Sequence, residues 1–201
     1  MSGILTSNSG RAGGIIGSGG GSSGGVASLV STVEASGQTT ISFTGLVTTV
    51  AAYEFDLVLH PSVDGRYLDV IFGTGSTSYV TSGYGWSNLG NRADSASTIS
   101  QAGTSASSMH IGEIASTNYL GSGTGEGINA RCILVPQTGD ASYPRLFWSG
   151  ALLGEDAQTC VRFIGSGSVL SATAVTAVQF GLTGAGNFAG GYISLRSYAK
   201  S

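Results

Sequence analysis

Few side chains in this sequence could bind a metal ion, and their spacing does not favour a site. The histidines, His60 and His110, and the cysteines, Cys132 and Cys160, do not form the close pairs that zinc sites use. Four acidic residues surround one turn, but they lack the dense spacing of a dedicated calcium loop; they are Glu54, Asp56, Asp64 and Asp69. We therefore predict no metal site and no cofactor.

Two glycine-rich motifs near the N-terminus match functional patterns by their letters alone. Residues 20–24 fit G-x-S-x-G, and residues 19–24 fit G-x-G-x-x-G. We expect no strand before them and no helix after them, so both the strained nucleophile turn and the phosphate-binding helix start are missing. The 11 acidic residues offer no pair that can be assigned to the opposed carboxylates of a glycosidase. We predict that the protein is not an enzyme.

A polar region carries the aromatic side chains best suited to contact a ligand. Tyr79, Tyr84 and Trp86 lie close together in the sequence, with Asn88 and Asn91 just after them. Aromatic rings in a polar loop often face a partner, so this group is a candidate glycan or partner contact. The alternative is that the rings pack the loop onto the rest of the domain or onto a neighbouring subunit. The residue types leave both interpretations open.

The composition favours strands and turns and suggests a protein that works in an assembly. The chain has 201 residues, of which 34 are glycine and 3 are proline, and charged residues make up only 9%. In a typical soluble domain about a quarter of the residues are charged. So low a charged fraction suggests that much of the surface is hidden against other chains. A neutral secreted β-sandwich is the alternative.

The charge pattern and the N-terminus narrow the choice of partners and of location. The eight basic residues are scattered from Arg11 to Lys200, and no run of them could neutralise successive phosphates, so we expect no nucleic-acid binding. No apolar stretch reaches the ~18 residues of a transmembrane helix, so we expect no membrane insertion. The first residues lack the features of a signal peptide. We therefore expect synthesis in a cytoplasm and free thiols at Cys132 and Cys160.

Residues 1–25 differ from the rest of the chain and are predicted to form an extended, Gly/Ser-rich N-terminal arm. Such a peptide cannot bury enough apolar surface on its own to offset its ordering entropy. We expect the arm to become ordered against a partner, and a flexible linker is the alternative. Residues 26–201 are predicted to form the folded domain. The arm's candidate attachment residues are two aliphatic pairs and its one charge, namely Ile4, Leu5, Arg11, Ile15 and Ile16.

Alternating apolar and polar residues predict roughly nine or ten β-strands, and no helix, in residues 26–201. The clearest strand runs over residues 53–60, with Tyr53, Phe55, Leu57 and Leu59 on one face. Strands at such spacing are typical of an antiparallel β-sandwich or a jelly roll, so we predict an all-β fold of this kind. The other strands are expected at residues 28–35, 39–46, 66–74, 109–115, 127–135, 144–153 and 158–165, with one or two short strands within residues 76–108.

The last part of the chain predicts a β-hairpin that closes the domain. Val178, Phe180 and Leu182 alternate with small or polar residues, and after a glycine-rich turn the alternation resumes with Ile193 and Leu195. Two such runs around a loop that contains glycine and asparagine are typical of a hairpin.

Three segments of the sequence resemble small all-β virion proteins of tailed bacteriophages. The closing segment AVTAVQFGLTGAGNFAGGYISLRSYAK resembles the closing hairpin of those proteins, and NSGRAGGIIG resembles the short segment that precedes their globular part. Residues 53–86 are similar to their strand, Asp-Gly turn, strand and Gly/Ser/Thr loop that ends in tyrosines. In this sequence Asp64 and Gly65 occupy the turn, and residues 79–86 occupy the end of the loop.

The resemblance implies a non-enzymatic structural protein of a tailed-phage virion, made in the host cytoplasm. The arm would attach the protein to other virion proteins of the tail or the capsid, and copies would associate as a homotrimer. Two placements follow: a tail or head fibre that exposes the sandwich to a host surface glycan, or a decoration (cement) protein that stabilises the capsid. A free carbohydrate-binding module is the hypothesis from another class.

Overall fold

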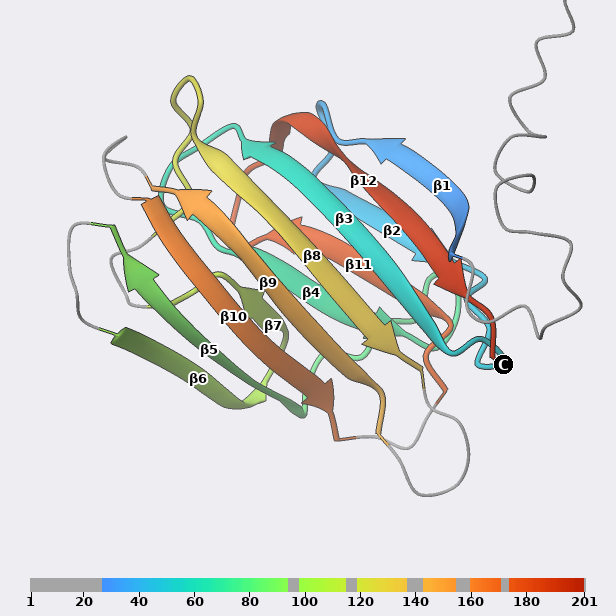
Figure 1. Cartoon of the computed structure of the whole chain (residues 1–201). Helices are drawn as coiled ribbons and strands as arrows, with labels where there is room; N and C mark the ends of the chain where they lie inside the picture. The colour runs from blue at the N-terminus through green and yellow to red at the C-terminus, as the bar shows by residue number, and fades with distance from the viewer. Residues whose placement is uncertain are drawn as a thin grey trace, which may run out of the picture.

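Twelve β-strands and no helix make up the part of the chain that the structure describes (Figure 1). The computed structural model describes residues 27–93, 98–114, 119–136, 143–154, 160–170 and 174–200. Nowhere in these ranges is there a helix with the length and apolar character needed to span a membrane. The prediction of an all-β fold is confirmed for these ranges.

The strands form two antiparallel sheets that pack together, which confirms the predicted β-sandwich. The large sheet has eight strands in the order β1 (Ala27–Glu34), β12 (Phe188–Tyr198), β3 (Ala52–Pro61), β8 (Gly127–Val135), β9 (Arg145–Leu153), β10 (Cys160–Val169), β5 (Tyr84–Arg92) and β6 (Thr98–Ala106). The small sheet has four strands in the order β2 (Thr40–Thr44), β11 (Ala177–Leu182), β4 (Leu68–Gly73) and β7 (Met109–Ile111).

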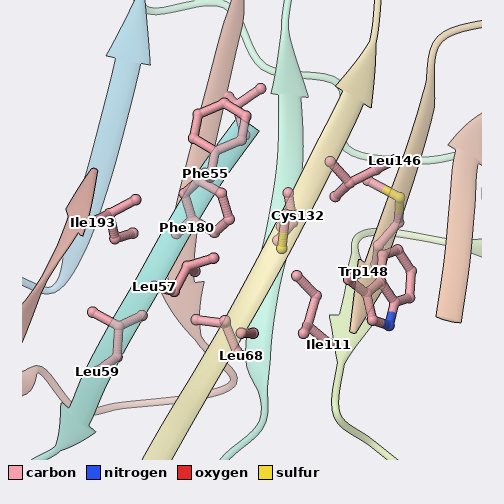
Figure 2. Close-up of a cluster of buried hydrophobic side chains, with 14 of the residues drawn as sticks. Phe55, Leu57, Leu59, Leu68, Ile111, Cys132, Leu146, Trp148, Phe180 and Ile193 are labelled. Carbon is pink, nitrogen blue, oxygen red and sulfur yellow. The ribbon is translucent and has the colours of Figure 1, made fainter. Parts of the chain in front are cut away.

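The core lies between the two sheets and follows the predicted alternation. The four residues of β3 that were predicted to share a face are all buried, and Figure 2 shows Phe55, Leu57 and Leu59 among them. Phe55 packs edge to face against Phe43 of β2 and Phe180 of β11, with ring centroids 5.3 and 5.2 Å apart. Edge-to-face pairs of this kind stabilise a core by about 0.5–1.5 kcal/mol beyond the apolar area they bury.

The predicted hairpin at the end of the chain is wrong, because β11 and β12 belong to different sheets. β11 pairs with β2 and β4, whereas β12 pairs with β1 and β3. Phe180 of β11 and Ile193 of β12 therefore point into the core from opposite sheets (Figure 2). Each strand has one apolar face, and the arch between sheets buries these two faces against each other. Alternation identifies the buried face of a strand but not its neighbour in the sheet.

Eight of the strands pair in a nested order. β1 pairs with β12, β2 with β11, β3 with β8, and β4 with β7. The other four strands, β5, β6, β9 and β10, extend the large sheet beyond β8 (Figure 1). Residues 76–108 were predicted to hold only short strands, but β5 and β6 are nine residues long each. The large sheet is therefore much wider than the small one.

Candidate functional site

Three of the five residues predicted to contact a glycan or a partner lie inside the protein. Tyr84, Trp86 and Asn88 occupy alternate positions of β5 and face the core, with 0%, 7% and 3% of their surface exposed. Tyr79 is half-buried and lies against Gly73. The predicted sugar-stacking platform is therefore wrong for the three residues of β5, since buried rings offer no free face to a ligand. The cause is that they belong to a strand and not to a loop.

Asn88 connects buried groups instead of contacting a ligand. Its Nδ2 donates hydrogen bonds to the backbone oxygens of His110 and Glu113, each at 2.8 Å. Its Oδ1 accepts a hydrogen bond from Nε1 of Trp148 at 2.5 Å. The side-chain amide is thus satisfied on both ends, as a buried polar group must be.

Tyr84 is also held by hydrogen bonds within the core. Its hydroxyl accepts a hydrogen bond from the backbone N–H of Phe72 at 2.7 Å and donates one to the backbone oxygen of Val80 at 3.0 Å. Burial raises the pKa of Tyr84 to about 12, and the hydrogen bond from Phe72 opposes this rise. This hydroxyl therefore stays protonated at neutral pH and fixes the loop before β5 to β4.

His110 lies between two carboxylates at the edge of the small sheet. Its Nε2 is 3.2 Å from Oδ1 of Asp69, and its Nδ1 contacts the carboxylate of Glu113. Ser108 donates a hydrogen bond to Asp69 at 3.1 Å, and burial raises the pKa of the Asp69 carboxyl. In a Ser-His-Asp triad the serine hydroxyl bonds to the imidazole, whereas Ser108 bonds to the Asp69 carboxylate. Within the described residues, no group of three or more histidine, cysteine or acidic side chains is arranged to hold a metal ion.

The surface of the large sheet that faces away from the small sheet, which we call the outer face, carries a charged network. Arg196 of β12 contacts Asp56 and lies 3.4 Å from Glu54, both of β3. Arg131 of β8 lies 3.3 Å from Asp56, and the hydroxyl of Tyr198 donates to Glu54 at 2.8 Å. These contacts join three neighbouring strands, so the network works as a cross-strand clamp.

A hollow lies on the outer face beside Phe147 of β9, and we call it the Phe147 hollow. It consists of two adjoining cavities of about 420 and 430 Å³ that share Ser87, Phe147 and Ser166. Exposed aliphatic side chains, Leu89 of β5 and Ile164 of β10, border it. Phe147 lies in the strand predicted over residues 144–153, and no function was predicted for it. Its neighbour Trp148 is buried, and alternation could have placed Phe147 outward.

The two cysteines are free thiols, as predicted. Cys132 of β8 pairs with Trp148 of β9, whereas Cys160 of β10 pairs with Leu153 at the far end of β9. The whole width of β9 and five ladder positions thus separate them. Cys132 is buried, and burial raises the pKa of its thiol. Cys160 is exposed and borders a groove of about 510 Å³ with His60.

The predicted attachment residues lie outside the described residues, which begin at Ala27 with edge strand β1. The attachment residues outside the described ranges are Ile4, Leu5, Arg11, Ile15 and Ile16.

No family model, no curated protein and no solved structure matches this chain. The resemblance to tailed-phage virion proteins therefore stays a prediction that rests on the three segments described above.

Proposed function

We propose that this protein is a non-enzymatic structural subunit of a tailed-phage virion, made in the host cytoplasm. Its N-terminal arm attaches it to other virion proteins, copies associate as a homotrimer, and the β-sandwich is exposed on the particle as part of a tail or head fibre. The alternative placement is on the head, where the subunit decorates and stabilises the capsid. The observation that carries the proposal is the nested pairing of eight strands.

This pairing has the order of a jelly roll. In that fold the first strand pairs with the last, the second with the next to last, and so on, while the chain passes between two sheets. We therefore interpret β5, β6, β9 and β10 as insertions that widen one sheet of a jelly roll. Viral capsid domains and lectin domains both use this fold. The shared strand order is an argument from fold analogy. The low charged fraction and the three resembling segments are independent support for a virion subunit.

One side of the sandwich has the features of a surface that another chain covers. β1 is an edge strand on which Leu29 and Val30 are 63% and 54% exposed. Between β1 and β2 lies a groove of about 290 Å³ whose lining includes Val30, Val33 and Val47. An apolar, unpaired edge favours association with other chains. In this proposal a neighbouring copy covers the edge, next to the point where the arm joins β1.

Labelling of particles tests the proposal. Gradient-purified particles of a phage that encodes this chain are incubated with a gold-labelled antibody raised against residues 27–200 and imaged by electron microscopy. Gold at the tail or on head fibres is expected for the fibre placement, and uniform gold over the head for the decoration placement. Protein that stays at the top of the gradient while particles carry no gold would contradict the proposal and favour a free carbohydrate-binding module.

A further inference from the structure

We propose that the Phe147 hollow binds a saccharide. The inference rests on the proposed function for one point only, namely that the saccharide belongs to a host surface. The chemistry of binding is inferred from the residues of the hollow itself. These residues come from the inserted strands β5, β6, β9 and β10, at the opposite edge of the large sheet from β1 (Figure 1). The proposed assembly edge and the hollow therefore do not compete for the same surface.

The floor of the hollow is a row of small side chains that begins at an aromatic ring. In the ladder of the large sheet, Phe147 pairs with Ser166, Ser166 with Ser87, and Ser87 with Ala102. Three inter-strand spacings give this row a length of about 14 Å. Phe147 is 44% exposed, so one end of the row presents a free ring above a floor of hydroxyl and methyl groups.

The neighbouring rows form the two sides of the hollow. On one side Ile164 pairs with Leu89, and both are exposed aliphatic residues. On the other side Arg145 pairs with Ser168, and Ser168 pairs with Gly85. The hollow therefore has apolar groups on one side and a cation on the other.

Arg145 differs from the arginines of the charged network. Arg131 and Arg196 contact carboxylates, whereas Arg145 is exposed and makes no ion pair with any residue in the described ranges. Its guanidinium presents five donors that no acidic side chain of those ranges occupies. It can therefore donate to a hydroxyl or a carboxylate of a bound molecule.

The combination of groups fits a saccharide better than a protein partner. A sugar ring has an apolar face of C–H groups and a rim of hydroxyls, so it can lie on the Phe147 ring while its hydroxyls meet Ser87, Ser166 and Arg145. Ligand sites generally combine aromatic or apolar walls with a few placed polar groups in this way. A protein partner would instead favour a larger continuous apolar patch.

Gly85 leaves the hollow open, although the fold does not require a glycine at this position. A Cβ added there would meet no atom within 4 Å, and its φ lies outside the left-handed region that favours glycine. At Gly103 of β6 a Cβ would collide with Trp86, and at Gly167 of β10 it would collide with Met109. A larger side chain at position 85 should therefore fill the hollow and leave the fold intact.

An oligosaccharide array tests the inference. The full chain, detected with antibody, is applied to immobilised oligosaccharides that contain neutral hexoses, N-acetylhexosamines or uronic acids, in parallel with F147A, G85L and the control V58A. Val58 is an exposed residue of the outer face away from the hollow. The wild type should bind a subset of the array, F147A and G85L should lose about tenfold or more in affinity, and V58A should bind like the wild type. Thermal melts monitor the folding of each variant. If G85L lowers the melting temperature, the binding of F147A alone is used to test the inference.

Two results would overturn the inference: wild-type protein that binds no member of the array, or binding that F147A leaves unchanged. Gold labelling of particles is a separate measurement. Particles that carry the protein while the array stays empty would refute the saccharide site and leave the proposed structural function standing. Binding on the array without gold on particles would support the site and refute the proposed function.

Discussion

Trp148 and Asn88 form a hydrogen bond across an intervening strand, with Nε1 of Trp148 donating to Oδ1 of Asn88 at 2.5 Å. Trp148 is in β9 and Asn88 is in β5, and Gly165 of β10 pairs with both of them in the ladder. A Cβ at Gly165 would collide with both side chains. The glycine therefore provides the space in which the inserted strands are tied together.

Gly165→Ala should destabilise the protein by about 2–4 kcal/mol, because the added methyl group overpacks the site and separates a buried donor from its acceptor. Gly85→Ala is the matched control, since its Cβ would meet open space, and it should change stability by less than about 0.5 kcal/mol. Urea unfolding measures both values. Equal midpoints for the two variants would show that the bond across β10 does not depend on Gly165.

Phe180→Ala should cost about 3–5 kcal/mol, because it removes a fully buried ring from the cluster with Phe43 and Phe55. Gln179→Ala, one residue earlier, should cost little, since that side chain is on the other face of β11 and only donates a hydrogen bond to Ser42 near the surface. Urea melts that gave the same loss for both variants would contradict the assignment of faces in β11.

Tyr84→Phe should destabilise the protein by about 1–3 kcal/mol, because the backbone N–H of Phe72 loses its buried acceptor. The pKa of Tyr84 is about 12 in the folded state and about 10 when unfolded, so its stabilising effect is complete below pH 10 and is lost as the pH rises toward 12. The difference in unfolding free energy between wild type and Tyr84→Phe, measured from pH 8 to pH 11.5, should shrink above pH 10.

Alkylation should distinguish the two thiols. Cys160 is exposed and should react in the native protein, whereas Cys132 is buried with a raised thiol pKa and should react only after denaturation. Mass spectrometry of peptides alkylated without a reductant, before and after denaturation, provides the measurement. Recovery of a peptide in which the two cysteines are crosslinked would refute the free-thiol assignment.

The sequence allows prediction of buried faces because side-chain alternation is a local property. The inward residues of β3 and β4 follow it, and so do those of β11 and β12. The pairing of strands is not a local property. β1 pairs with β12 at the other end of the described chain, and β11 and β12 lie in different sheets. This choice is made by the burial of apolar faces over the whole domain, which no single segment encodes.

The candidate ligand site likewise depends on contacts between segments that are distant in the sequence. Tyr84, Trp86 and Asn88 alternate as a buried strand face does, but they lie in a stretch rich in Gly, Ser and Ala whose strand is stabilised by its ladders with β10 and β6. The polar Asn88 is acceptable in the core because Trp148 donates to it across Gly165 and its own amide donates to the backbone oxygens of His110 and Glu113. Phe147 could be placed outward by alternation, whereas the small residues beside it come together only through the register of four strands.

The proposed attachment to the virion depends on the N-terminal arm, and deletion of the arm gives the most direct test. Fixing a Gly-rich peptide costs ~1–2 kcal/mol per residue in backbone entropy, and burial of Ile4, Leu5, Ile15 and Ile16 returns only ~1.5–3 kcal/mol each. A partner surface that also supplies backbone hydrogen bonds is therefore needed. The amount of protein in gradient-purified particles is compared between the full chain and a variant that lacks residues 1–25. We predict that the deletion leaves the melting temperature unchanged and sharply reduces incorporation. Equal incorporation of both forms would contradict attachment through the arm.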